Sequence, residues 1–186
     1  MYLPVRTPAP AAADGAQQVV ALAKAAGSFL AKPDGPRVAT IDFGGWDTHA
    51  NQPGEYGVLA RNFRQLDRAI ATLKDSLGDA WGHTAVLMVT EFGRTVAVNG
   101  SRGTDHGTAG AAFLAGGAVR GGRVIADWPG LAERDLYQGR DLAPTLDLRA
   151  VFTSALVAQL GVSEAALESR VFPDSRAIRP LEGLFV

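Results

Sequence analysis

The sequence predicts an α/β fold in which a mostly parallel β-sheet is flanked by helices. Three neighbouring segments carry this prediction. An amphipathic helical pattern covers residues 56–77, a short apolar segment precedes it at 37–43, and another follows at 84–90. A strand, a helix and a second strand in this order form a βαβ unit, whose two strands run parallel beneath the helix. We expect functional residues where these strands end.

The first predicted element is a helix over residues 17–32, which ends at Pro33. Its apolar residues fall three and four positions apart, as one face of a helix requires; they are Val19, Leu22, Ala23, Ala26, Phe29 and Leu30. Residues 37–43 follow as a short, partly β-branched strand, which Gly44 and Gly45 close.

The clearest helical pattern spans residues 56–77 and stops at Gly78. One continuous apolar stripe runs along it, formed by Leu59, Phe63, Leu66, Ile70, Leu73 and Leu77. The next strand, 84–90, is apolar on both faces, which is typical of a central strand in a parallel sheet.

A third strand is predicted at 111–115, followed by loops with a short edge strand at 119–142 and a last helix at 147–160. Residues 1–16 are rich in proline and alanine and are predicted to be a disordered or extended lead-in. Residues 17–186 are expected to form a single α/β domain.

The composition excludes several classes of protein. With 186 residues, 47% of them hydrophobic, the chain is long enough for one domain with a core. The formal net charge of -1 gives no basis for binding nucleic acid. Cysteine is absent, as is any apolar stretch of about 18 residues, so we expect neither disulfides nor insertion into a membrane. No secretory signal opens the chain, as in a soluble cytoplasmic protein.

Residues with metal-binding chemistry follow the first two predicted strands. Asp47 and His49 come after the first strand, and Glu91 and Arg94 come after the second. Because the carboxyl ends of parallel strands meet at one edge of a sheet, we expect these residues to lie together. His106 precedes the third strand and joins them if that strand runs antiparallel.

A carboxylate together with imidazoles is the ligand set of zinc or manganese. Asp47 and His49 are two positions apart and point to the same side of an extended loop, so they can bind one cation together. Arg94 carries a permanent positive charge suited to a phosphate or sulfate oxygen and is the candidate anion-binding residue.

Each of these residues also has a simpler interpretation. Asp47 can close an Asx turn, and His49 can be an ordinary exposed loop residue. Glu91 and Arg94 can form an ion pair that holds a turn, and His106 can orient a tight glycine turn. The third histidine precedes the second strand, at the opposite edge of the sheet, and is interpreted as structural. A metal site and a set of loop contacts both stay open here.

Four motifs occur in order along the chain: Gly44-Gly45-Trp46-Asp47-Thr48-His49, Glu91-Phe92-Gly93-Arg94-Thr95, Gly103-Thr104-Asp105-His106-Gly107 and Val171-Phe172-Pro173. Together they resemble a bacterial family, the domain-of-unknown-function family 1501, which is distantly similar to the alkaline phosphatase and sulfatase superfamily. The resemblance implies the carboxy-terminal part of an alkaline-phosphatase-like domain. It also implies that Asp47, His49 and His106 bind one metal and that Glu91 is an acidic ligand of another.

The chain departs from the superfamily's pattern in three ways. One residue, Thr48, separates the first two ligands, where the superfamily usually has three. Phe92 stands where the superfamily usually has histidine, and phenylalanine cannot coordinate a metal. The half of the superfamily domain that carries the nucleophile is expected to be absent, as is the twin-arginine signal of exported family members.

Two functions are compatible with these motifs. The resemblance implies a metal-binding, hydrolase-like domain acting on small anionic substrates, namely phosphate or sulfate esters. The alternative is a non-catalytic module that binds a metal or an anion or serves as a scaffold. The expected cofactor is a divalent metal, zinc or manganese. A missing half-domain would leave sheet edges exposed, which favours a homo-oligomer.

Overall fold

The computed structural model describes residues 15–52 and 54–186. These residues form two compact units. The first contains 15–47 and 54–78, and the second contains 48–52 and 79–186. Residues 1–14 of the predicted lead-in lie outside the described part of the chain, and the single domain expected over 17–186 stays a prediction.

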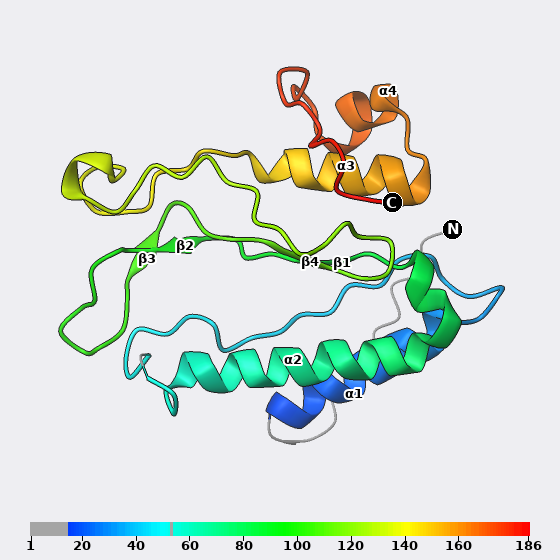
Figure 1. Ribbon diagram of the computed structural model, residues 1–186, viewed down its shortest axis with the longest axis horizontal. Helices are drawn as coiled ribbons and strands as arrows, with labels where there is room; N and C mark the ends of the chain where they lie inside the picture. Colours follow the sequence, from blue (N-terminus) through cyan, green and yellow to red (C-terminus); the bar gives the residue numbers. More distant parts are fainter. Residues whose placement is uncertain (1–14, 53) are drawn as a thin grey trace. The chain divides into compact units, whose positions relative to one another are not determined.

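The first unit is a pair of helices packed side by side, α1 (Gly15–Leu30) and α2 (Val58–Leu77) (Figure 1). Both helices were predicted, and their bounds agree with the apolar patterns to within two residues. The side of α2 that is buried carries Leu73 and Leu77, which are 8% and 3% exposed. Phe29 of α1 was expected in the core, but it is 47% exposed and lies under the ammonium group of Lys32.

Small residues allow the two helices to approach closely. The buried ridge of α1 is formed by Val19, Ala23 and Gly27, spaced four residues apart. A Cβ atom on Gly27 would lie 2.6 Å from the Cβ of Ser76 and 3.1 Å from the carbonyl oxygen of Leu73. Only glycine fits at this point without moving α2.

The strand predicted at 37–43 is wrong. These residues have no regular secondary structure, and Val38 is 56% exposed. Their β-branched composition favours a strand, but strand propensity depends on burial and on a neighbouring strand that accepts the hydrogen bonds. No such neighbour exists among the residues that the structure describes. Without this strand there is no βαβ unit.

The predicted mostly parallel sheet flanked by helices is also wrong. In the second unit, β1 (Val86–Met88) pairs antiparallel with β4 (Phe113–Ala115), and β2 (Gly93–Arg94) pairs antiparallel with β3 (His106–Gly107). The strand expected at 84–90 therefore exists only at its centre, as β1, and the strand expected at 111–115 only at its end, as β4. A short apolar run does not specify the direction of its partner, because buried parallel and antiparallel strands can have the same composition.

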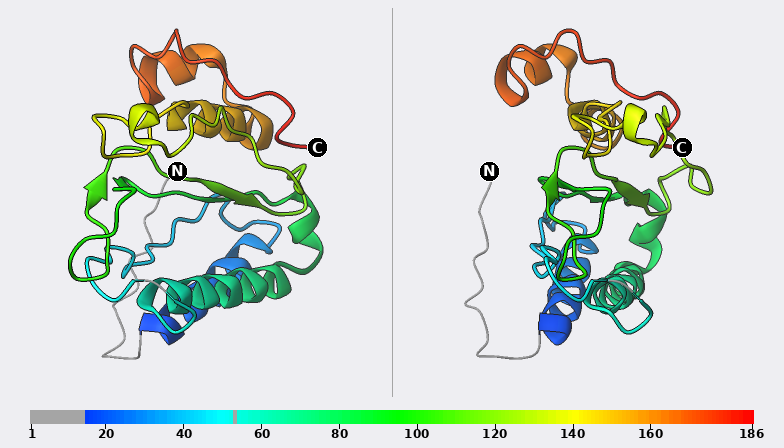
Figure 2. Two further views of the ribbon diagram at one scale, coloured as in Figure 1. Left: turned by 60° about the vertical axis from the view of Figure 1, so that its left-hand side comes forward. Right: turned by 90° about the vertical axis from the view of Figure 1, so that its left-hand side faces the viewer.

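The remaining elements of the second unit are helical and short. They are η1 (Gly78–His83), η2 (Glu133–Asp135), α3 (Leu148–Leu160), α4 (Glu164–Ala166) and η3 (Leu167–Val171) (Figure 2). The first residue of η1, Gly78, is the last residue of the first unit. The predicted helix 147–160 is confirmed as α3. Asp147 caps its first turn by accepting a hydrogen bond from the amide of Arg149. No helix in the described part of the chain is long and apolar enough to cross a membrane.

Replacing Gly27 by valine tests the close packing of α1 and α2. The new side chain would collide with α2, so we expect the free energy of unfolding to fall by about 1–3 kcal/mol, as for other overpacked sites. Ala25→Val is the matched control, because Ala25 is exposed on the same helix. This variant should lose only the difference in helix propensity between alanine and valine, which is below about 1 kcal/mol. Chemical denaturation followed by circular dichroism measures both. Equal losses would show that the helices do not depend on this close approach.

Candidate metal centre

Two histidines that are 57 positions apart in the chain meet in the second unit. His49 belongs to segment 48–52, and His106 is the first residue of β3. Their Nε2 atoms lie 3.3 Å apart, and their ring centroids lie 5.0 Å apart. Both side chains are exposed, with His49 48% accessible, so the pair is open to solvent and to a ligand.

Backbone hydrogen bonds hold these two parts of the chain together. The amides of Asn51 and Gln52 donate to the carbonyls of Ser101 and Arg102, and the amide of Thr104 donates to the carbonyl of Thr48. Segments 48–52 and 101–104 therefore run against each other, directly beside the two histidines.

Gly103 makes this close approach possible. A Cβ atom on Gly103 would collide with the carbonyl group of His49 and the amide nitrogen of Ala50. A Cβ atom on Gly107 would likewise collide with the backbone of Arg94, and one on Gly93 with the backbone of Ala109, two residues after β3. These three glycines thus allow backbones to approach each other closely.

Asp47 completes a group that could hold a metal ion. One ligand atom from each of Asp47, His49 and His106 lies within 4.8 Å of the others, and all three residues are exposed. Asp47 directly precedes segment 48–52, so the peptide chain itself keeps it two residues from His49.

Within the first unit, α2 positions the chain that leads to Asp47. The side-chain amide of the buried Asn62 donates to the carbonyl of Gly45. The ring of Trp46 packs edge-on against Phe43 and Phe63, with centroids 5.2 and 5.0 Å away. Trp46 is therefore a packing residue that fixes the neighbouring backbone.

The second nitrogen of His49 faces a carboxylate. Nδ1 of His49 lies 3.3 Å from Oδ1 of Asp105. The side-chain amide of Asn99 donates to the same oxygen at 3.1 Å. The hydrogen bond from Asn99, and then that from His49, holds the pKa of Asp105 below its ordinary value. A lowered pKa means that this carboxylate favours folding at neutral pH, and that its contribution is lost as the pH falls through the folded-state pKa.

The ring of His106 is held by a neighbour that cannot bind a metal. Phe92 stacks on it with centroids 4.1 Å apart and planes inclined by 21°. The guanidinium of Arg94 lies 5.1 Å from the centroid of Phe92 and donates to the carbonyl of Thr104. Arg94 is also the Cα partner of His106 in the β2–β3 pair.

The other sequence-predicted residues lie outside this group. Glu91 is exposed and does not belong to the metal-capable group of the described residues, so its role as a ligand of a second metal stays a prediction. His83 is the last residue of η1 and also lies outside the group.

Sequence reasoning missed Asn99, Asp105 and Phe92 as supporting residues. Asn99 had one signal, because Asn99-Gly100-Ser101 is typical of a turn.

A buried carboxylate supports the β2–β3 pair from its other end. Asp141 is only 1% exposed and lies beside Arg140, whose Nε atom is 2.9 Å from Oδ1. Its Oδ2 atom accepts a hydrogen bond from Thr108, two residues after His106. Burial raises the pKa of Asp141, but the hydrogen bonds from Arg140 and Thr108 outweigh it and lower the pKa overall. The ionised group thus ties the end of this strand pair to residue 141.

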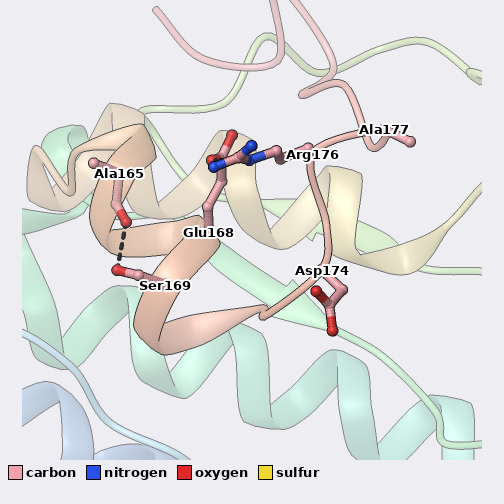
Figure 3. Close-up of a pocket in the computed structure, with 6 residues that line it drawn as sticks. All are labelled: Ala165, Glu168, Ser169, Asp174, Arg176 and Ala177. Carbon is pink, nitrogen blue, oxygen red and sulfur yellow. Dashed lines mark hydrogen bonds and ion pairs between the residues drawn. The ribbon is translucent and has the colours of Figure 1, made fainter.

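A hollow in the second unit lies away from this chemistry. It measures about 770 Å³ and is lined by η3 and the loop that follows it. Figure 3 shows the side chains of Glu168 and Arg176 next to each other, with Asp174 pointing away from them. Glu168 and Arg176 form an exposed ion pair with N and O atoms 3.1 Å apart. Because its charged groups bind each other and do not converge on a ligand, we assign no site to this hollow.

The described part of the chain is a two-unit α+β protein with an exposed carboxylate and two imidazoles at one point. The chain belongs to the family described as "Protein of unknown function (DUF1501)", whose model matches residues 8–172. This confirms the family that the four motifs indicated. Comparisons with curated proteins and with solved structures gave no match.

Gly103→Ala tests the backbone contact beneath the site. The added methyl group would push segment 48–52 away, so we expect a loss of at least about 1 kcal/mol in the free energy of unfolding. The amides of Asn51, Gln52 and Thr104 should exchange with solvent faster, which hydrogen-exchange NMR measures. Gly100→Ala is the matched control, because a Cβ there would meet nothing within 4 Å. Unchanged exchange in Gly103→Ala would contradict the role given to this glycine.

Proposed function

We propose that this chain binds a divalent metal, zinc or manganese, through Asp47, His49 and His106. One observation carries the proposal, namely the 3.3 Å separation of the two Nε2 atoms. Two zinc–nitrogen bonds of about 2.0–2.1 Å at a tetrahedral angle span about 3.3 Å. The two imidazoles therefore stand at the spacing of two ligands of one ion.

The donor set fits such an ion. Two imidazole nitrogens and one carboxylate oxygen are found together in catalytic zinc sites, where a further position is left for water or substrate. The exposure of all three residues is compatible with that open position. When bound, a divalent metal would supply a site at which water becomes a nucleophile near neutral pH.

We further propose that the substrates are small anionic esters of phosphate or sulfate. Arg94 supports this, because it is the Cα partner of His106 in the β2–β3 pair and guanidinium groups match phosphate and sulfate oxygens. The resemblance of the motifs to the alkaline phosphatase and sulfatase superfamily supports the same reaction class. In this proposal Arg94 binds and orients the ester, and Asp47 and the two histidines hold the metal.

Zinc binding tests the first part of the proposal. We expect purified protein to bind zinc or manganese with one site, as measured by isothermal titration calorimetry and elemental analysis. His49→Ala and His106→Ala should each weaken binding by more than the roughly 10–100-fold loss that follows removal of an outer-shell residue. His83→Ala is the matched control and should bind as the wild type does. If all three histidine variants bind alike, the metal site is not at His49 and His106.

Ester hydrolysis tests the second part. Protein loaded with zinc or manganese should hydrolyse members of a panel of phosphate and sulfate monoesters, and His106→Ala should abolish this activity. Arg94→Ala should raise KM more than it lowers kcat, because Arg94 is expected to bind the anion. Metal binding without any turnover would exclude hydrolysis and leave a non-catalytic metal-binding module as the function.

A further inference from the structure

We propose that Asp105 is a positioning residue that fixes the tautomer of His49: its carboxylate accepts a hydrogen bond from Nδ1–H of His49, which leaves Nε2 of His49 unprotonated and facing His106. The inference rests on the proposed metal-binding function, because the tautomer of His49 decides whether Nε2 can bind a metal. The tautomer itself, however, is a property of the metal-free protein and can be measured there.

The argument begins with the imidazole of His49. A neutral imidazole carries one N–H, and the partner of each nitrogen decides which nitrogen keeps the proton. Nδ1 lies 3.3 Å from Oδ1 of Asp105, and a carboxylate can only accept a hydrogen bond. The proton therefore belongs on Nδ1. Nε2 is then unprotonated, and it lies 3.3 Å from Nε2 of His106.

Asn99 keeps Asp105 in place. Its amide nitrogen donates to Oδ1 of Asp105 and also to the backbone carbonyl of His49, each at 3.1 Å. Its amide oxygen accepts from the backbone amides of Ser101 and Gly103, each at 3.0 Å. Both donor hydrogens and both acceptor positions of this side chain are thus used. The side chain is fixed to the backbone on both sides, and so the carboxylate is held at a set place relative to His49.

The opposite tautomer of His49 would lose the hydrogen bond to Asp105. If Nε2 of His49 carried the proton, Nδ1 would present a lone pair to the carboxylate, and two acceptors would face each other. Nε2 would then donate to His106 and could not bind a metal until it lost that proton, because a metal ligand must be deprotonated. In the arrangement we propose, the proton between the two Nε2 atoms is on His106, and that ring must move it away from Nε2 before this nitrogen binds a metal.

Proton-detected NMR of protein labelled with nitrogen isotope at histidine tests the inference. The protein is treated with a chelator and studied at mildly alkaline pH. The nitrogen shifts distinguish the two tautomers. We expect His49 in the wild type to be mainly the Nδ1–H form. Asp105→Ala should return it to a mixture of both tautomers, whereas Asp105→Asn, whose amide oxygen can still accept the hydrogen bond, should retain part of the preference.

Asp127→Ala is the matched control, because it removes an exposed carboxylate from a loop of the same unit and should leave the tautomer of His49 unchanged. Circular dichroism shows whether each variant is folded. If Asp105→Ala does not fold, Asp105→Asn still tests the inference. A wild-type His49 in the Nε2–H form, or a tautomer that does not respond to either change at position 105, would overturn the inference.

Zinc titration separates this inference from the proposed function. If both hold, Asp105→Ala should weaken zinc binding by about 10–100-fold, the usual effect of losing an outer-shell carboxylate, and Asp105→Asn should weaken it less. If the tautomer depends on Asp105 but the wild type binds no metal, the proposed function fails and the role of Asp105 stands. If zinc binds at His49 and His106 with an unchanged affinity and tautomer in both variants, the role of Asp105 fails and the metal site stands.

Discussion

The contact between segments 48–52 and 101–104 is the constraint on which the candidate site depends. Backbone hydrogen bonds join the two segments, and Gly103 leaves the room that they need. A buried polar cluster reinforces them, because the hydroxyls of Thr48 and Thr104 both donate to the side-chain oxygen of Gln52, at 2.9 and 2.8 Å. Buried polar groups are costly when unpaired, so this cluster favours one register of the two segments. That register brings His49 to His106.

The helices could be predicted from the sequence and the sheet could not. A helix is specified by local periodicity, and the stripes of 17–32, 56–77 and 147–160 are all local patterns. A strand needs a partner, and pairing is non-local. Residues 37–43 have a composition typical of a strand but find no neighbour within the described residues. Residues 84–90 do find one, but it is the antiparallel segment 111–115, so that the expected crossover through α2 never forms.

The candidate site was predicted in part, although the sheet from which it was argued is absent. His106 was expected near Asp47 and His49 only if the segment after it ran antiparallel, and β4 does so. Asp105 and Phe92 were not predicted as supporting residues, because they act on the rings of His49 and His106 and not on a ligand. Phe92 stood out only as a residue unable to coordinate a metal. Its stacking on His106 gives it a different role, which is to orient the imidazole ring.

The exposure of these residues links the fold to the proposed function. Ion pairs between exposed side chains contribute little to the free energy of unfolding, so the contact between His49 and Asp105 adds only slightly to the stability of the fold. A bound metal changes this balance, because a ligand that binds only the folded state adds about 2.7 kcal/mol at a concentration a hundred times its Kd. Through His49 and His106 it would cross-link segment 48–52 to β3, the two parts of the second unit that the backbone contact already joins. The metal and the backbone contact would then stabilise the same register, each making the other more favourable.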